Sequence, residues 1–161
     1  MGTKGVAVFP GVFDPVTRGH LDIIRRGAAL FDRLVVAVAE NPDKRSLFPA
    51  DERVAMMREA VADLDAVEVQ AYEGLTVEFV GRCGAAVILR GLRQHSDFEY
   101  EYQLALTNRT ISGIETVFVM ADEKVAYVSS HLVREVARLG GDVSALVPPN
   151  AVQALKAKLG A

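Results

Sequence analysis

Residues Gly5–His20 read GVAVFPGVFDPVTRGH, an apolar run that leads into a turn with glycines and prolines. The run Val6–Phe9 is short and continuously apolar, which predicts a buried strand. Beyond the turn, apolar residues recur at the spacing of one helix face: Leu21, Ile24, Ala28 and Phe31. The stretch therefore predicts a strand, a turn and an amphipathic helix in direct succession.

The predicted turn has the features of an anion-binding site. Glycine lets a backbone approach a ligand closely, and both Gly11 and Gly19 belong to this turn. The first-turn N–H groups of the following helix lack partners within the helix and readily bind an anion. His20 falls in that first turn, where its imidazole can donate a hydrogen bond to a phosphate and charges easily near neutral pH. A single histidine at a helix start is more commonly a surface residue or a packed core residue. The prediction of an anion site therefore depends on the strand, the turn and the helix together and not on His20 alone.

The rest of the chain alternates between strand-like and helix-like runs. The predicted strands are Val6–Phe9, Leu34–Ala39, Val67–Gln70, Ala85–Leu89 and Glu115–Met120. The predicted helices are His20–Phe31, Asp51–Leu64, Thr76–Cys83, Asp97–Ile111, Ser130–Leu139 and Ala151–Leu159. Apolar strands that alternate with helices are typical of a parallel sheet buried on both faces. We expect an α/β fold, a Rossmann-like doubly wound five-stranded parallel sheet with helices on both faces, as a single domain over residues 1–161.

Two helix starts carry their own signals. Asp51 and Glu52 place acidic side chains in a first turn, just after Pro49. The stretch Ser96–Glu99 fits the Ser-x-x-Glu capping box, which predicts that Ser96 caps the fourth helix.

Composition narrows the class of protein. The chain has 161 residues, of which 50% are hydrophobic and 24% charged, and this is typical of a globular domain with a core. We find no apolar run long enough to span a bilayer and no signal peptide after Met1. One cysteine, Cys83, cannot form an intrachain disulfide and fits a reducing cytoplasm. The net charge of −3 argues against broad nucleic-acid binding but leaves room for a local anion site.

Basic residues follow several of the predicted strands. Ligands of such sheets bind beyond the carboxyl ends of the strands, so residues that follow different strands meet at one edge. Lys44 follows the second strand, and Arg90 and Arg93 follow the fourth. A planar guanidinium suits phosphate oxygens, and Gly91 between the two arginines allows close approach. The sequence therefore predicts a site for a phosphate-rich ligand, with Ser129 and Ser130 at another helix start nearby.

Four segments together resemble bacterial phosphopantetheine adenylyltransferases, a family of the nucleotidyltransferase superfamily. Pro10–His20 is similar to the family's opening and contains its T-x-G-H signature, and Ile88–Glu101 contains its RGLR and DFEYE segments. Val128–Val136 resembles the ISSS-x-x-K/R-E-V segment, and Gly140–Val143 also matches. Because these motifs occur in the family's order along nearly the whole chain, the resemblance is specific.

The resemblance implies an enzyme that joins ATP and 4′-phosphopantetheine to give dephospho-coenzyme A and pyrophosphate. It further implies Mg²⁺ as cofactor, a homohexamer and coenzyme A as a feedback ligand, with no nucleic-acid or membrane partner. Attack by an anionic phosphate on the α-phosphorus needs no general base, and positioning and charge stabilisation can supply the catalysis.

The resemblance also assigns site residues. The catalytic set is His20, Lys44 and Arg93, with no side chain expected to bind a metal. The ATP-binding set is Val12, Phe13, His20, Gly91, Leu92, Arg93, Glu101, Val125, Ala126, Tyr127, Val128, Ser129, Ser130 and His131. The acceptor-binding set is Val12, Lys44, Thr76 and Arg90.

The chain departs from the family pattern at two of these positions. Val12 stands where the family has threonine or serine, and His131 stands at the third serine of the ISSS run. Three alternatives remain open at this point. One is a sister adenylyltransferase with another acceptor, and another is a non-catalytic nucleotide-binding domain. A response-regulator domain is the third, although it would need an acidic cluster after the first strand, which Asp14 alone does not supply.

Overall fold

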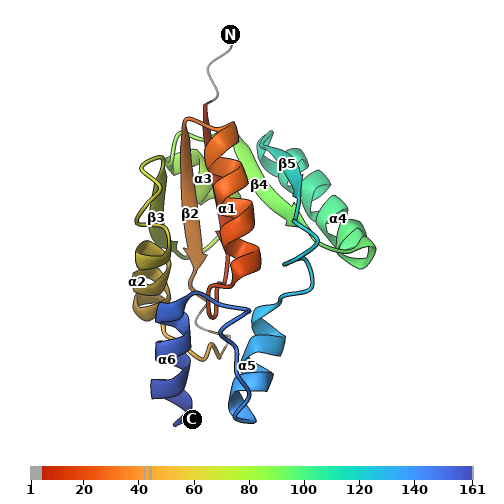
Figure 1. The fold of residues 1–161 in the computed structure, drawn as a ribbon. Coiled ribbons are helices and arrows are strands. Elements are labelled where there is room, and N and C mark those ends of the chain that lie inside the picture. The colour runs from red at the N-terminus through yellow and green to blue at the C-terminus, as the bar shows by residue number, and fades with distance from the viewer. Residues whose placement is uncertain (1–4, 42, 44, 161) are drawn as a thin grey trace.

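The computed structural model describes residues 5–41, 43 and 45–160, so the predicted ligand Lys44 lies outside the described residues. Strands and helices alternate along the chain until β5, and two helices follow (Figure 1). The strands are β1 (Val6–Gly11), β2 (Arg33–Ala39), β3 (Val67–Tyr72), β4 (Val87–Leu92) and β5 (Glu115–Met120). The helices are α1 (Arg18–Leu30), α2 (Ala50–Ala60), α3 (Thr76–Arg82), α4 (His95–Ser112), α5 (Ser130–Arg138) and α6 (Pro149–Leu159).

The five strands form one parallel sheet in the order β3-β2-β1-β4-β5, which confirms the predicted Rossmann-like α/β fold. The chain moves outward from β1 to β3, then crosses back to β4 on the other side of β1. The point of reversal between β1 and β4 is where ligands of such sheets bind. The pairing of these two strands is short, because only Ala7 with Val87 and Val8 with Ile88 are in register.

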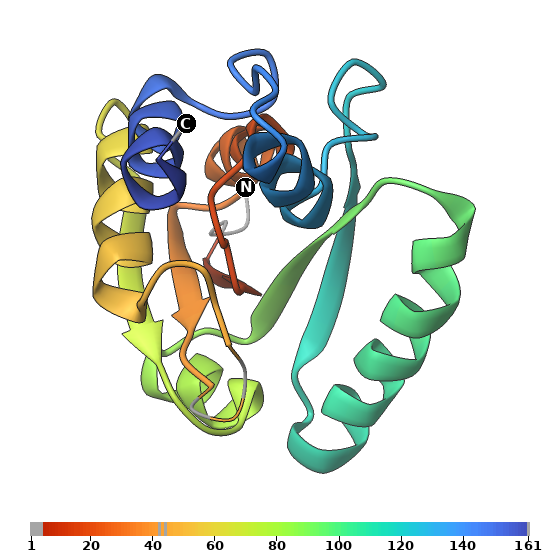
Figure 2. The same ribbon diagram turned by 90° about the horizontal axis from the view of Figure 1, so that it is seen from below.

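Helices cover both faces of the sheet, and the core has a part on each face (Figure 2). Successive residues of a strand point to opposite faces, and this is visible in β1. Ala7 and Phe9 join the larger cluster with α1, α2, α5 and α6, whereas Val8 joins the smaller cluster with α3. On the α3 face, α3 and α4 line one cavity together with Ile88 of β4.

Three local predictions were wrong, and one of them is the end of the second helix, since α2 ends at Ala60 and not at Leu64. The fourth strand does not end at Leu89 but continues to Leu92, so Arg90 lies in the strand and not after it. Helix α4 begins at His95 with Gln94 as its N-cap, and no side chain caps it, so Ser96 does not form the predicted capping box. By contrast, α2 has the predicted acidic residues Asp51 and Glu52 in its first turn.

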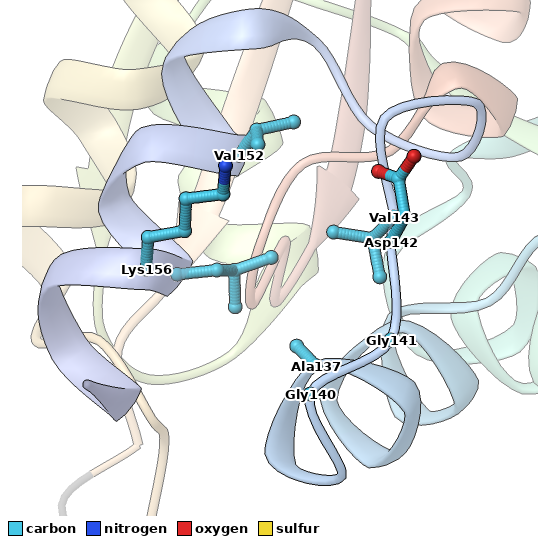
Figure 3. Close-up of a pocket in the computed structure, with 8 residues that line it drawn as sticks. Ala137, Gly140, Gly141, Asp142, Val143, Val152 and Lys156 are labelled. Carbon is cyan, nitrogen blue, oxygen red and sulfur yellow. The ribbon is translucent and has the colours of Figure 1, made fainter. Parts of the chain in front are cut away.

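A small pocket of about 210 Å³ lies between the end of α5 and α6 (Figure 3). Val143, Val152 and Leu155 give it apolar walls, with Asp142 and Lys156 also lining it. It shares no lining residue with the larger cleft at the carboxyl end of β1. Among the described residues, no helix has both the length and the apolar character needed to cross a membrane.

Helix α1 packs tightly on the sheet at a buried glycine, Gly27. A Cβ atom there would lie 2.5 Å from Leu89 Cδ2 and 3.0 Å from Leu34 Cδ2, and both leucines are fully buried. We expect Gly27→Ala to lower the free energy of unfolding by about 1–2 kcal/mol, because overpacking outweighs alanine's better helix propensity. Urea denaturation of the purified variant measures this change.

Gly81 in α3 is the matched control. It is exposed, and a Cβ atom there would meet nothing within 4 Å. We expect Gly81→Ala to raise the free energy of unfolding by about 0.5–1 kcal/mol through helix propensity alone. An equal gain for Gly27→Ala would show that α1 is not in close contact with the sheet.

Candidate active site

A cleft of about 710 Å³ opens where β1 and β4 part. Its walls come from the β1–α1 turn, the end of β4 and the first turns of α4 and α5. The predicted site residues that line it are Val12, Phe13, His20, Arg90, Gly91, Arg93, Glu101, Val128, Ser129 and Ser130. The cleft thus brings together segments that are up to about 120 positions apart in the chain, as the sequence predicts for this edge of the sheet.

A second cavity of about 400 Å³ lies beside the cleft, between α3, α4 and the sheet. Thr76, which the sequence places in the acceptor-binding set, lines this cavity, and its hydroxyl lies 2.9 Å from Tyr72 Oη. The two spaces share six lining residues: Pro10, Gly11, Val12, Arg90, Tyr100 and Glu101. The site is therefore a pair of adjoining spaces that meet at Val12 and Arg90.

His20 is held by the start of its own helix. Thr17 is the N-cap of α1, and its hydroxyl accepts a hydrogen bond from the His20 N–H at 3.3 Å. In return, the Thr17 N–H donates to His20 Nδ1 at 3.0 Å. The Phe13 ring packs edge-on against the imidazole, with 4.9 Å between ring centroids. Since Nδ1 accepts a main-chain hydrogen bond, the imidazole carries its proton on Nε2.

The environment of His20 keeps it neutral. Burial, together with the positive charges of Arg93 and Arg90, lowers its pKa to about 3. This corrects the expectation that His20 charges easily near neutral pH. The residue is instead a neutral hydrogen-bond donor in the cleft.

Arg90 is fixed by a carboxylate and a carbonyl. Its Nε donates to Glu101 Oε2 at 2.8 Å, its Nη2 pairs with Glu101 Oε1, and its Nη1 donates to the Pro10 carbonyl at 2.8 Å. Glu101 is the one buried residue of α4, all of which lies within the described residues. Because two further N–H groups of the guanidinium remain, Arg90 can still bind a phosphate. Arg93 donates to the Val128 carbonyl at 3.0 Å and lies 3.5 Å from Asp97.

The two serines at the start of α5 have structural partners as well. Ser129 is the N-cap, and its hydroxyl accepts a hydrogen bond from the Leu132 N–H at 3.2 Å. The Ser130 hydroxyl donates to the Pro15 carbonyl at 2.8 Å, which joins α5 to the β1–α1 turn. The free N–H groups of this first turn stay available to an anion.

Some predicted residues do not line the cleft. In the described part of the chain these are Leu92, Val125, Ala126, Tyr127 and His131. Tyr127 and His131 are exposed, and the Val125 carbonyl instead approaches Gly19, 3.3 Å from where a Cβ atom would be. Gly19 is therefore needed for close packing of this loop on α1.

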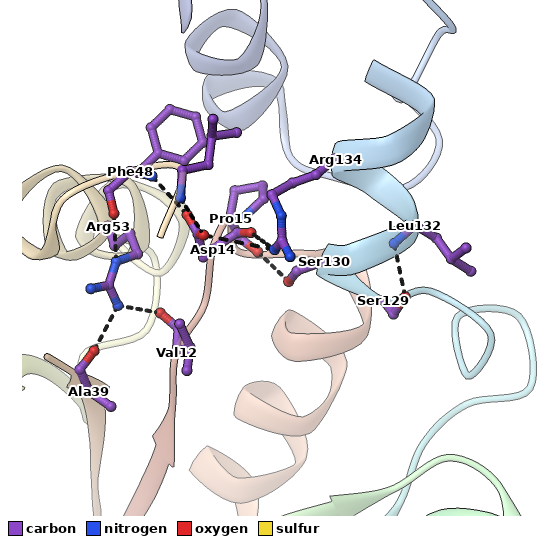
Figure 4. A network of polar contacts seen from close by, with 11 residues as sticks. Val12, Asp14, Pro15, Ala39, Phe48, Arg53, Ser129, Ser130, Leu132 and Arg134 are labelled. Atoms are coloured by element: carbon purple, nitrogen blue, oxygen red, sulfur yellow. Dashed lines mark hydrogen bonds and ion pairs between the residues drawn. The ribbon is translucent and has the colours of Figure 1, made fainter. Parts of the chain in front are cut away.

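Sequence reasoning missed a network behind the β1–α1 turn (Figure 4). The buried Asp14 carboxylate accepts hydrogen bonds from the Leu47 N–H at 2.7 Å and the Phe48 N–H at 2.9 Å. Arg134 of α5 donates to the Asp14 carbonyl, and Arg53 of α2 donates to three other carbonyls. Arg134 falls in the quoted Val128–Val136 motif, but nothing in the sequence distinguishes Arg53 from the other charged residues of its helix.

The carboxylates of the cleft are already engaged. Asp14 accepts two main-chain hydrogen bonds, Glu101 pairs with Arg90, and Asp97 lies 3.5 Å from Arg93. Within the described residues, no three histidine, cysteine, aspartate or glutamate side chains gather as a metal site would require. A divalent ion in this cleft would therefore have to be bound chiefly by ligand oxygens, and Mg²⁺ commonly binds in this way.

Comparison with known proteins agrees with this geometry. The cytidylyltransferase-like family model matches residues 8–136. A phosphopantetheine adenylyltransferase from Geotalea daltonii is 53% identical over 154 residues, which are 95% of this chain and 96% of the relative. Another, from Alkalilimnicola ehrlichii, is 56% identical over 153 residues, which are 93% of this chain and 88% of the relative.

A solved structure supports the fold. A crystal structure from Vibrio parahaemolyticus, provisionally named a nicotinate-nucleotide adenylyltransferase, matches with a TM-score of 0.71 over 95% of this chain and 99% of that chain. At 19% identity, it shows a common fold and no more. The family model and the two close relatives identify the group: the chain belongs to the cytidylyltransferase-like family and, within it, to the phosphopantetheine adenylyltransferases.

Proposed function

We propose that the chain transfers the adenylyl group of ATP to 4′-phosphopantetheine, giving dephospho-coenzyme A and pyrophosphate in coenzyme A synthesis. The observation that carries this proposal is the pair of adjoining spaces that meet at Val12 and Arg90, with His20 in the larger one. A transfer between two substrates needs two such spaces with a common boundary, where the reacting groups approach each other.

In this proposal ATP occupies the larger cleft and the acceptor occupies the second cavity. The β- and γ-phosphates lie at the first turn of α5, beside Ser129 and Ser130, and Arg93 faces the nucleotide phosphates. The acceptor phosphate binds Arg90 at the boundary, and the sequence motif adds Lys44, which lies outside the described residues. The pantetheine arm runs past Thr76.

The reaction is an in-line displacement. An oxygen of the acceptor phosphate forms a bond to the α-phosphorus, the bond from that phosphorus to the bridging oxygen breaks, and pyrophosphate leaves with the electron pair. No proton has to be removed from the nucleophile, because it is already an anion. His20 donates a hydrogen bond from Nε2 to the α-phosphate, where charge accumulates in the transition state.

Mg²⁺ enters this scheme as part of the nucleotide substrate. Because Asp14, Glu101 and Asp97 have partners in the protein, the phosphate oxygens of ATP would supply most of the ligands of a bound Mg²⁺. The ion reduces the charge of the phosphates when it is bound. Coenzyme A carries the same pantetheine arm as the acceptor, so we propose that it competes for the second cavity as a feedback ligand.

A further part of the proposal is a homohexamer, supported by an exposed apolar face on α4 and β5. Phe98, Tyr102 and Leu106 are spaced four residues apart on α4 and are 36–50% exposed. Met120 of the edge strand β5 is 67% exposed. Exposed large apolar side chains that recur along one helix and an edge strand are a feature of protein–protein contact surfaces. The single cysteine, Cys83, agrees with the cytoplasmic location that we propose.

Pyrophosphate release tests the reaction directly. Purified protein is incubated with ATP and Mg²⁺, with and without 4′-phosphopantetheine, and nicotinate mononucleotide serves as the control acceptor. We expect release only with phosphopantetheine. Release with the control acceptor alone would indicate a sister enzyme, and nucleotide binding without any release would indicate a non-catalytic domain.

His20→Ala tests the role of the imidazole. If its hydrogen bond is stronger in the transition state than in the ground state, kcat falls by about 10²–10³-fold while KM for ATP changes little. His95→Ala is the matched control, because His95 is exposed and lines neither space. An unchanged kcat in His20→Ala would remove this residue from the mechanism.

The protonation state of His20 gives a second test. Because its pKa is about 3 in the folded chain and near 6.5 when unfolded, the unfolded chain binds one more proton between these values. The contribution of His20 to the free energy of unfolding is therefore complete above pH 6.5 and decreases as the pH falls toward 3. Histidine ¹⁵N NMR is expected to show a single Nε2–H tautomer for His20 from about pH 5 to 8. Protonation of His20 within that range would contradict this expectation.

A further inference from the structure

Arg53 is a buried cation that binds main-chain carbonyls. It lies on α2, is 3% exposed, and donates from Nη1 to the Val12 carbonyl at 2.7 Å and to the Ala39 carbonyl at 2.8 Å. Its Nε donates to the Phe48 carbonyl at 3.0 Å. Among the described residues, no carboxylate lies within 4.0 Å of its guanidinium, so these carbonyls are its close partners. Burial lowers the pKa of Arg53, and the more distant Asp14 and Glu40 partly oppose this.

The three carbonyls come from three different segments that meet at the candidate site (Figure 4). Val12 follows β1 and lines both the cleft and the second cavity. Ala39 is the last residue of β2 and lines the second cavity. Phe48 closes the loop between β2 and α2, and its N–H is also bound by Asp14. One side chain therefore ties the turn after β1 to the end of β2 and to the base of the next loop.

The chemistry of this position requires a guanidinium. Burying a charge is unfavourable unless hydrogen bonds compensate, and a planar guanidinium can bind several carbonyls at once where a lysine ammonium cannot match the geometry. Because the side chain of Val12 has no hydrogen-bonding group, a phosphate at the boundary of the two spaces can find polar partners on this residue only in the main chain. The position of that main chain is set in part by the bond from Arg53 to the Val12 carbonyl.

We propose that Arg53 is a positioning residue, which holds the Val12–Phe13 main chain in the geometry that adenylyl transfer requires. This inference rests on the proposed function for its kinetic consequence, but the structural consequence is independent of it. Arg53 touches neither substrate in this scheme and acts through the turn. Displacement of reacting groups by small distances lowers turnover strongly, so we expect loss of the guanidinium to lower kcat.

The experiment compares Arg53→Lys and Arg53→Met with Arg58→Met. Arg58 is the matched control, because it lies on the same helix and donates to the Val69 carbonyl at 3.1 Å, outside both spaces. We expect kcat to fall by about tenfold or more in Arg53→Met, with a smaller loss in Arg53→Lys, while KM for ATP stays within about twofold. Arg58→Met is expected to keep the wild-type kcat. Thermal unfolding of all three variants identifies any loss of folded protein.

Amide NMR gives a readout that does not depend on catalysis. In Arg53→Lys the signals of Val12 and Phe13 are expected to shift or broaden, and in Arg58→Met they are expected to stay in place. Unmoved signals, or a wild-type kcat in both Arg53 variants despite reduced thermal stability, would overturn the positioning role. If Arg53→Met does not fold, the Lys variant decides the question alone. An inactive wild-type enzyme would instead contradict the proposed function, and the NMR comparison would still test Arg53.

Discussion

The short pairing between β1 and β4 is the constraint on which the rest of the site depends. β1 stays in register with β2 as far as Gly11 and Val38, but it pairs with β4 only at Ala7 and Val8. Two strands that separate toward their carboxyl ends leave a crevice that no ladder hydrogen bond closes. The glycine of β4 takes part in this arrangement, because a Cβ atom on Gly91 would lie 2.7 Å from Ile23 of α1. Helix α1 can therefore approach the end of β4 and place His20 in the opening.

In a chain whose net charge is negative, four arginines in or behind this crevice are held in place. Arg90 pairs with Glu101, Arg93 donates to the Val128 carbonyl, and Arg53 and Arg134 bind carbonyls of the surrounding turns. Fixed donors need little rearrangement when charge develops on a ligand, which is the basis of electrostatic catalysis. The same contacts connect β1, β2 and α5. A change in how these elements pack would therefore also change the geometry of the site.

The strands and their parallel direction could be predicted because buried apolar runs alternate with helices along the whole chain. The end of β4 could not, since Arg90 looks like a loop residue until its pairing with Glu101 is known. The neutrality of His20 also escaped prediction, because it depends on burial, on two distant arginines and on the main-chain hydrogen bond to Nδ1. For Arg53 the sequence carries no signal at all. Its three partners are carbonyls, which every residue possesses, and only the folded chain brings them together.

Because His20 is uncharged near neutral pH, the pH dependence of the proposed reaction is expected to come from its ligands. A phosphate monoester dianion takes up a proton near pH 6 and becomes a monoanion, well above the pKa of about 3 that the imidazole has in the cleft. On mild acidification the nucleophile would lose charge first, while the protein's donor stayed as it was. On mild acidification, therefore, the protonation state of the substrate would change while that of His20 would not. In a relative whose imidazole was exposed and far from such arginines, the protein and the substrate would both change protonation on mild acidification.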